Sequence, residues 1–384
     1  MPFSARQGLF GVATTPGAGP SPYDWPGYLT SSEFTSEVTN DFTGSGAHTN
    51  SIVSVTGSMG YRGGILADNG NIYMCPRGQT SMLELDPSND STTKISLSGV
   101  SADEYTGGVL ASNGNIYCPA FGGSSTILEF NPADGSSTEI TPTGSYTTFN
   151  IGGATLPSGK VMFQPRSSGG HFTIYDPATN TASQAGSKTL SENFEYLGCV
   201  AHQNSNVYVM PFNGQQVSYY NEGSNSWTDI DVSSVIGDNS AACQGGVMMA
   251  DGRIVGVKYG TNGLFVFDPS NDSFFLDTYS STWTGYTNAS QSYIGGALGA
   301  DGNVYFANFN AGASIEHVFD TQANSVVFTS SASNNRNGNV GAVAAGNGNV
   351  YFVPNSSNDI AKKDTTGTAT NAEVMKSPQL NKGF

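Results

Sequence analysis

The stretch GGILADNGNIYMCP, residues 63–76, decides the fold because the chain contains seven versions of it. Each version has a glycine-rich apolar run, a two-residue turn and a second run that usually carries an aromatic residue. The copies begin at Gly63, Gly107, Gly152, Gly198, Gly245, Gly295 and Gly341, so the steps are 44, 45, 46, 47, 50 and 46 residues. Repetition at this period is typical of arrays in which no unit buries its apolar faces alone.

Each repeat predicts four antiparallel strands. The first two flank a turn such as Asn69-Gly70, a pair that favours the positive φ angles of a type I′ hairpin. A third run ends at Asp-Pro or Asn-Pro, as in LELDP (83–87), and leads through a capped turn into a fourth run such as STEIT (137–141). Four strands in about 45 residues make one propeller blade. We therefore predict an all-β, seven-bladed β-propeller with four-stranded antiparallel blades.

The ends of the repeat array suggest how the ring closes. SIVSVT (51–56) precedes the first repeat, where a fourth strand precedes every later copy, so we expect it to complete the seventh blade. ATNAEVM (369–375) competes for the same place, and the sequence leaves both alternatives open. The predicted organisation is an N-terminal arm at 1–50, a propeller at 51–375 and a C-terminal tail at 376–384.

Composition excludes several classes of partner. The 384 residues carry a net charge of −16 and only 11% are charged, so most of the surface is expected to repel nucleic acid. No apolar run approaches the ~18 residues of a membrane span, and the opening MPFSARQGLFGVAT lacks the profile of a secretory signal. We expect synthesis in the cytoplasm and no membrane insertion.

The sequence predicts no metal and no cofactor. The four cysteines show no metal or redox spacing and are interpreted as buried thiols, and the histidines at 48, 171, 202 and 317 show no metal-binding spacing. DPSNDS occurs at 86–91 and 268–273, but neither copy has the central Gly or the twelfth-position Glu of a calcium loop. We interpret both as turns capped by Asp and Asn side chains.

Candidate binding residues fall on one face of the predicted propeller, where the loops from fourth to first strands and from second to third strands meet. Basic residues on this face are expected to form a cationic ring that receives a carboxylate of a partner or of an acidic glycan, and aromatic residues to stack on a sugar. The alternative is that they only pack or keep the loops soluble. The candidates are Arg62, Arg77, Arg166, Lys258, Tyr105, Trp283 and Tyr286.

The repeat resembles the kelch type of β-propeller over residues 51–375. The resemblance is carried by the glycine doublets, the Tyr of NIY and NVY, the turn YDPATN (175–180) and SNSW (224–227). The sequence departs from the kelch pattern because its glycine doublet opens the first strand and most repeats lack the Trp.

The arm carries a second resemblance. FSARQGLFG (3–11) is similar to the opening of structural proteins of tailed bacteriophages, marine ones in particular. That resemblance implies an arm that anchors the chain to other virion proteins, with Arg6, Phe10 and Trp25 as the expected contacts. Apolar residues along a Pro- and Gly-rich arm also favour ordering by docking.

Together these features predict a non-enzymatic virion protein of a tailed phage, associated with the tail or a fibre, whose propeller binds a host-surface glycan or another subunit. Capsid decoration is one alternative, and a cellular or secreted kelch-like glycan-binding or scaffold protein is another. A glycan-cleaving enzyme would need the carboxylates of Asp103, Glu104, Glu192 and Glu195 to converge.

Overall fold

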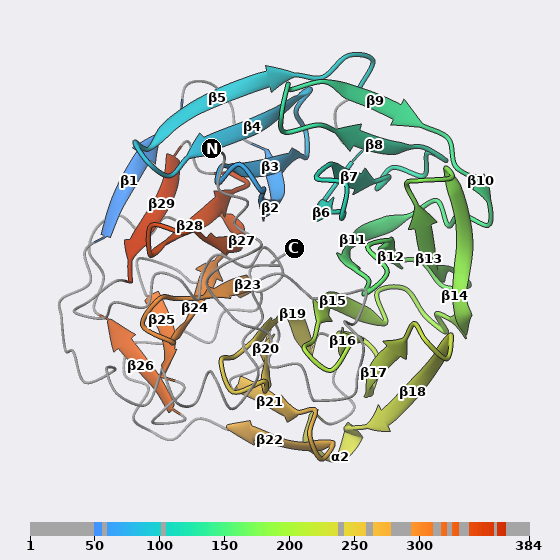
Figure 1. Ribbon diagram of the computed structural model, residues 1–384. Helices are drawn as coiled ribbons and strands as arrows, with labels where there is room; N and C mark the ends of the chain where they lie inside the picture. Colours follow the sequence, from blue (N-terminus) through green and yellow to red (C-terminus); the bar gives the residue numbers. More distant parts are fainter. Residues whose placement is uncertain are drawn as a thin grey trace, which may run out of the picture.

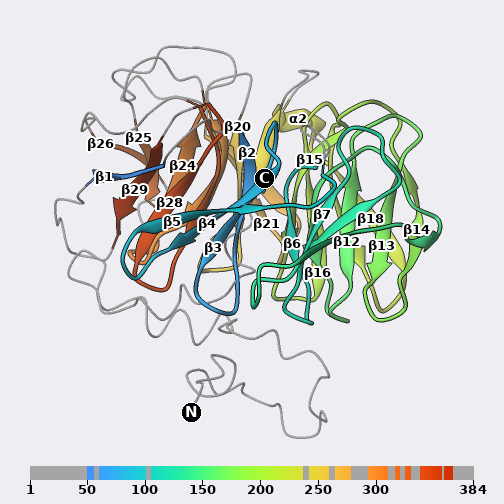
Figure 2. The ribbon, with the colours of Figure 1, turned by 90° about the horizontal axis from the view of Figure 1, so that it is seen from above.

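The chain folds as a β-propeller in its computed structural model, which describes residues 50–55, 60–100, 105–236, 242–258, 264–277, 293–309, 316–320, 325–329, 338–356 and 359–365. Within these residues the strands form seven sheets. The sheets follow one another in chain order around a central axis (Figure 1), and seen from the rim (Figure 2) they stand side by side. The predicted arm and tail, and the competing segment 369–375, lie outside the described residues.

The first three blades follow the predicted order, with the first strand innermost. Blade 1 comprises β2 (Tyr61–Leu66), β3 (Ile72–Pro76), β4 (Ser81–Asp86) and β5 (Ser91–Ser96). Blade 2 comprises β6 (Val109–Leu110), β7 (Ile116–Pro119), β8 (Ile127–Phe130) and β9 (Ser137–Ile140). Blade 3 comprises β11 (Asn150–Thr155), β12 (Val161–Pro165), β13 (His171–Asp176) and β14 (Thr181–Thr189).

The next three blades repeat this arrangement. Blade 4 comprises β15 (Tyr196–Ala201), β16 (Asn206–Pro211), β17 (Gln216–Asn221) and β18 (Ser226–Asp231), followed by the helical turn α2 (Ser233–Ile236). Blade 5 comprises β19 (Cys243–Met248), β20 (Ile254–Lys258), β21 (Leu264–Asp268) and β22 (Ser273–Asp277). Blade 6 comprises β23 (Tyr293–Leu298), β24 (Val304–Asn308), β25 (Glu316–Asp320) and β26 (Ser325–Thr329).

The last blade closes the ring with a strand from the other end of the array. It comprises β27 (Asn339–Ala344), β28 (Asn349–Pro354), β29 (Asp359–Asp364) and, outermost, β1 (Asn50–Ser54). β1 pairs antiparallel with β29 from Asn50 opposite Lys363 to Ser54 opposite Asp359. This confirms the prediction that the segment before the first repeat supplies the missing fourth strand.

Blade 3 departs from the prediction by carrying a fifth strand. β10 (Thr143–Gly144) leaves the outer edge of blade 2 and pairs in parallel with β14, Thr143 opposite Thr181. The Thr143 amide also donates to the Asn180 carbonyl at 3.0 Å. Two residues with little apolar character give no strand signal in the sequence, so this pairing depends on the neighbouring blade.

The glycine doublets pack the inner strands around the axis. The first glycine of every copy has a positive φ, from 55° at Gly107 to 109° at Gly198, and the strand register shifts there in six of the seven blades. The second glycine lies against neighbouring backbone or side chains: a Cβ on Gly64 would clash with Val343 of the previous blade, and one on Gly153 with the Met162 carbonyl of its own blade. The doublet therefore combines a bulge with a close blade contact.

The core is divided among the junctions between blades. Seven clusters of buried apolar residues occur in the described part of the chain, and each joins two neighbouring blades, including blade 7 with blade 1. In the cluster of blades 1 and 2, the buried thiols of Cys75 and Cys118 lie 3.0 Å apart. Each sheet thus buries both faces only because it has two neighbours.

The hairpin turns differ from the predicted type I′. Gly70 has φ 86°, whereas Asn69 does not have a positive φ, and the Gly70 amide donates to the Ala67 carbonyl at 3.0 Å. This is a type I turn followed by a left-handed glycine. The Asn69 side chain explains the preference, because its Oδ1 accepts from the Asn71 amide at 3.0 Å and its Nδ2 donates to the Tyr73 hydroxyl at 2.9 Å.

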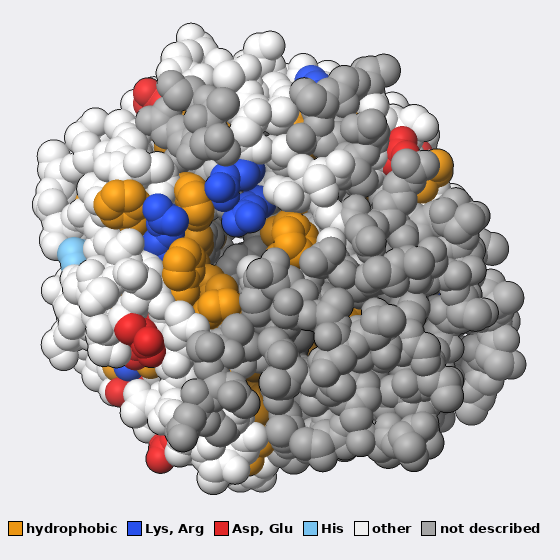
Figure 3. Space-filling model, turned by 180° about the vertical axis from the view of Figure 1, so that it is seen from behind, with side chains coloured by type: hydrophobic (Ala, Val, Ile, Leu, Met, Phe, Trp, Pro, Cys, Tyr) orange, Lys and Arg blue, Asp and Glu red, His pale blue; other side chains and the backbone are white. Residues whose placement is uncertain are grey.

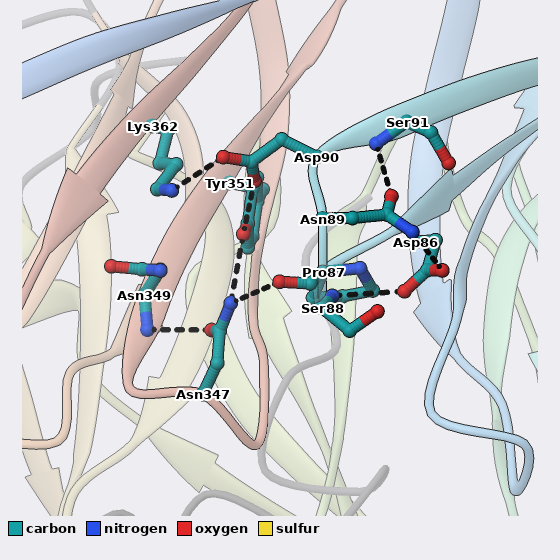
Figure 4. Close-up of polar contacts among 10 residues, drawn as sticks. All are labelled: Asp86, Pro87, Ser88, Asn89, Asp90, Ser91, Asn347, Asn349, Tyr351 and Lys362. Atoms are coloured by element: carbon teal, nitrogen blue, oxygen red, sulfur yellow. Dashed lines mark hydrogen bonds and ion pairs between the residues drawn. The ribbon is translucent and has the colours of Figure 1, made fainter.

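The same contact links asparagine and tyrosine in other repeats and extends across the junction between blades. Asn347 Nδ2 donates to the Tyr351 hydroxyl and, across the junction, to the Pro87 carbonyl at 2.6 Å (Figure 4). The Tyr351 hydroxyl donates to Asp90 at 2.8 Å, and Lys362 Nζ lies 2.7 Å from the same carboxylate.

We call the surface that carries the hairpin turns and the turns between third and fourth strands the turn face.

The turn containing DPSNDS is therefore part of a blade junction. Within it, Asp86 Oδ1 accepts from the Ser88 amide at 2.8 Å and Asn89 Oδ1 accepts from the Ser91 amide at 2.8 Å (Figure 4). Its second copy is capped in the same way, with Asp268 Oδ1 accepting from the Ser270 amide at 2.9 Å. Both copies confirm the interpretation as capped turns.

Candidate functional site: the mouth of the axis

The opposite surface, which carries the loops from fourth to first strands and from second to third strands, has a hollow at the axis. We call this surface the mouth face. A cavity of about 160 Å³ opens there, lined by Arg62, Arg77, Thr106, Gly107, Phe121, Ile151, Gly152, Phe194, Leu197, Gln244 and Val340. The space-filling view shows Lys or Arg side chains and hydrophobic side chains gathered around the central opening (Figure 3).

Three of the predicted arginines meet at this mouth. Arg62 belongs to the innermost strand β2, and Arg77 and Arg166 each follow the proline that ends a second strand, in blades 1 and 3. All three are half-buried. Burial, and secondly the positive charge of Arg77, lower the pKa of Arg166. The sequence prediction of a local cationic cluster thus agrees with the positions of these three residues.

Phenylalanine rings hold the guanidinium groups in place. The guanidinium carbons of Arg77 and Arg166 lie 4.0 and 4.1 Å from the centre of the Phe121 ring. Arg166 also lies 5.0 Å from the ring centre of Phe149 and 5.9 Å from that of Phe194. Contacts at these distances are attractive and orient the flat guanidinium group.

Backbone hydrogen bonds connect the same residues. The Arg166 amide donates to the Phe149 carbonyl at 2.9 Å, and the Arg166 carbonyl accepts from the Phe194 amide at 2.7 Å. Phe194 has a positive φ of 54°, which is unusual for a bulky residue. Loops joined in this way present their side chains in a fixed arrangement, and strained backbone of this kind concentrates at functional sites.

The other predicted binding residues do not join this cluster in the described part of the chain. Tyr105 is only 1% exposed, and its hydroxyl hydrogen-bonds with Thr126 Oγ1 at 2.7 Å and donates to Glu139 at 2.9 Å. The prediction that Tyr105 binds a ligand is therefore wrong, because its ring is part of the core between blades 1 and 2. The side chain of Lys258 lies outside the described residues, as do Trp283, Tyr286, Arg6, Phe10 and Trp25.

The acidic residues considered for catalysis are only partly described. Glu195 is buried, and its Oε2 accepts from the amide and the hydroxyl of Ser191 at 2.6 and 2.9 Å. This contact gives Glu195 a loop-capping role, while Glu192 is exposed. Asp103 and Glu104 lie outside the described residues. No group of three or more His, Cys, Asp or Glu within the described ranges is placed to hold a metal ion.

The histidines that can be described have structural surroundings. His202 is buried, and its Nδ1 accepts from the Asn204 amide at 3.1 Å while Nε2 donates to the Gly252 carbonyl of blade 5 at 2.7 Å. Burial lowers the pKa of His202. His171 lies 3.1 Å from the Ser145 hydroxyl at the edge of blade 3. His202 therefore links blades 4 and 5, and His171 bonds within the edge of blade 3.

Sequence reasoning missed the phenylalanines of the mouth. Phe121 is the second residue after Pro119, the proline that ends the second strand of blade 2. Arg77 is the first residue after the equivalent Pro76 of blade 1. Aligning the loops after each second strand would have found Phe121. Phe149 has no repeat counterpart that marks it, so only the fold brings its ring beside Arg166.

Comparison with known proteins shows the fold alone. No protein-family model and no curated protein sequence matches the chain. Among solved structures, it is similar to streptogramin B lyase, with a TM-score of 0.66 and 13% identity over 82% of this chain and 97% of that one. Catalytically inactive virginiamycin B lyase from Staphylococcus aureus with quinupristin gives 0.67 and 13% over 83% and 99%.

An extracellular domain is also similar. The extracellular domain of a hybrid two component system from B. thetaiotaomicron gives a TM-score of 0.63 and 11% identity over 85% of this chain and 44% of that one. Lyases and a domain of a two component system therefore share this architecture, so the fold alone does not indicate a function. The chain has no helix, within its described residues, that is long and apolar enough to cross a membrane.

Proposed function

We propose that this chain is a non-enzymatic structural protein of a tailed-phage particle, associated with the tail or a fibre, in which a seven-bladed, kelch-like propeller is displayed for binding. The virion part of the proposal rests on the similarity of residues 3–11 to the opening of phage structural proteins. The binding part rests on Arg62 and Arg77, which line an open axial cavity, and on Arg166, which packs with Arg77 against the Phe121 ring beside it.

The mouth supports binding better than catalysis. Its guanidinium groups remain protonated at neutral pH and are suited to holding an anion, whereas general acid–base catalysis needs a group that exchanges a proton near that pH. Glu195, one of the acids considered for hydrolysis, already accepts two hydrogen bonds from Ser191. A fixed cationic recess on an acidic protein attracts an anionic partner selectively.

Association with particles tests the virion role. Particles purified from a phage that encodes the full-length protein should contain it. Mass spectrometry should find it at a constant ratio to the major capsid protein. The double substitution Arg6→Ala, Phe10→Ala should remove it from particles, whereas Arg253→Gln on the turn face should not. A wild-type protein found only as a free monomer in lysates would contradict the virion role and favour the cellular glycan-binding or scaffold alternative.

The position of the protein on intact particles separates the remaining alternatives. Electron microscopy with an antibody against the propeller should label the tail or its fibres. Labelling of the capsid surface would favour the decoration role. Turnover of any polysaccharide in a panel of acidic and neutral chains, lost in Glu192→Gln, would overturn the non-enzymatic part.

A further inference from the structure

The mouth holds a donor and an acceptor that are buried without hydrogen-bond partners among the described residues. The donor is Arg166 Nε and the acceptor is Gln244 Oε1. Gln244 lines the cavity from β19, and Arg166 stands over Phe121, which lines it from blade 2. Buried polar atoms without partners are costly, so their presence beside an open cavity indicates a ligand that satisfies them.

We propose that the mouth is a binding site for one acidic sugar residue, of the uronic acid class, at the end or on a branch of a glycan. This inference deepens the proposed function by naming the ligand. A sugar carboxylate would accept from the guanidinium groups of Arg166 and Arg77, and a ring hydroxyl would donate to Gln244 Oε1. Neither group alone satisfies both protein atoms.

An exposed aromatic ring completes the site. Phe149 is 37% exposed, one of two large exposed hydrophobic side chains in the described part of the chain, and lies 5.0 Å from the Arg166 guanidinium. A phenyl ring beside a cationic group presents an apolar surface to the C–H face of a pyranose while its carboxylate is held.

The size of the cavity favours a sugar residue over a peptide segment. Its ~160 Å³ lies below the roughly 300–1,000 Å³ of pockets that enclose drug-sized ligands. A single ring fits this scale. The whole chain carries a net charge of −16, so a long polyanion would be repelled beyond the mouth, whereas a single terminal charge would not.

Titration calorimetry of the full-length protein with digalacturonic acid tests the site, with the neutral disaccharide of galactose as the matched ligand. We expect the acidic disaccharide to bind at least about 10-fold more tightly, since hydrogen bonds between charged groups are stronger than those between neutral groups. The difference should shrink when salt rises from about 0.02 to 0.2 M. Equal binding of both sugars would overturn the proposal.

Variants locate the binding. Arg166→Gln should weaken digalacturonate binding by about 10- to 100-fold, and Phe149→Ala by about 2- to 10-fold. Gln244→Met should weaken digalacturonate binding but leave the weak binding of acetate unchanged. Arg253→Gln, whose arginine pairs with Asp251 at 2.7 Å on the turn face, is the control with the same loss of charge and should bind normally.

The binding experiments test the sugar ligand independently of the virion role. Normal binding by Arg166→Gln, with its thermal unfolding unchanged, would overturn the site. A hexaglutamate peptide that binds more tightly than digalacturonate, and loses binding in Arg166→Gln, would show that the mouth takes a protein carboxylate and would overturn the sugar assignment. Particle association depends on Arg6 and Phe10 in the separate experiment above, so either result can fail while the other stands.

Discussion

The turn face and the mouth face of this propeller differ in how far they follow the repeat. On the turn face, the same asparagine and tyrosine recur and bond to each other, at 2.9 Å for Asn69 with Tyr73 and 2.8 Å for Asn113 with Tyr117. At the mouth, arginine follows the second-strand proline in blades 1 and 3 only. Repeated residues hold the blades together, and the residues that break the repeat form the recess.

Alkaline pH should affect the turn face most. Burial raises the pKa of Tyr73, Tyr175 and Tyr220 to about 12 each, against about 10 in an unfolded chain. Their stabilising contribution is complete below about pH 10 and is lost as pH rises toward 12, at about 1.4 kcal/mol per pH unit for each tyrosine. Urea unfolding at pH 8 to 11.5 measures this loss.

A single substitution sharpens the assignment of that loss. Tyr73→Phe should lower by one the number of protons released on unfolding at high pH. It should also lower the free energy of unfolding at pH 8, because the hydrogen bonds of the Tyr73 hydroxyl are lost. Wild type that shows one more phenolate than Tyr73→Phe at pH 10 to 11, with both proteins still folded, would show that the Tyr73 ring is not protected by burial.

The mouth depends on one repeated element, the glycine at each inner-strand bulge. A Cβ on Gly107 would lie 2.9 Å from Gly152 Cα, whereas a Cβ on Gly152 would have no neighbour within 4 Å. Both have a positive φ, so each alanine costs about 1–2 kcal/mol. Gly107→Ala should cost about 1–3 kcal/mol more than Gly152→Ala through the clash. Equal unfolding free energies in urea would show that the inner strands are not tightly packed.

The junction of blades 7 and 1 provides a smaller test of the turn-face network. Asp90→Asn removes the carboxylate that accepts from Tyr351 and pairs with Lys362 (Figure 4). We expect a loss of about 1–2 kcal/mol in the free energy of unfolding. Asp272→Asn is the matched control at the same turn position of blade 5, where the Asp is exposed. An effect as large in the control would place the energy in the turn and not in the junction.

The repeated residues explain why the fold was predictable and the site only partly so. The Gly doublet and the Asn-Gly turn recur at similar spacing, so one blade predicts the others. The register of the array favoured 51–56 as the closing strand but left 369–375 as an alternative. The type I′ assignment was wrong because Asn69 bonds through its side chain and needs no positive φ. Tyr105 was misplaced because it lies outside the named strands, where the sequence indicates an exposed loop, while its ring packs in the core between blades 1 and 2.

The mouth arginines were predictable, whereas their partners were not. Arg77 and Arg166 share a position after proline, which gave a signal within the sequence. The contacts of Arg166 with Phe149 and Phe194 join the loops that enter blades 3 and 4, and no local pattern encodes a contact between separate loops. Residues that leave the repeat are therefore the ones to examine for function in such arrays.

Removing a mouth arginine should have the smallest effect on folding. Arg166 loses hydration in its half-buried position and is repelled by Arg77, and these costs offset its contacts with three rings. We expect Arg166→Gln to change the free energy of unfolding by less than about 0.5 kcal/mol, measured in urea at pH 7. A loss above 2 kcal/mol would show that the arginine supports the fold as the turn-face residues do. A near-zero change in the free energy of unfolding is expected for a residue that serves ligand binding, because its favourable partner is present only in the complex.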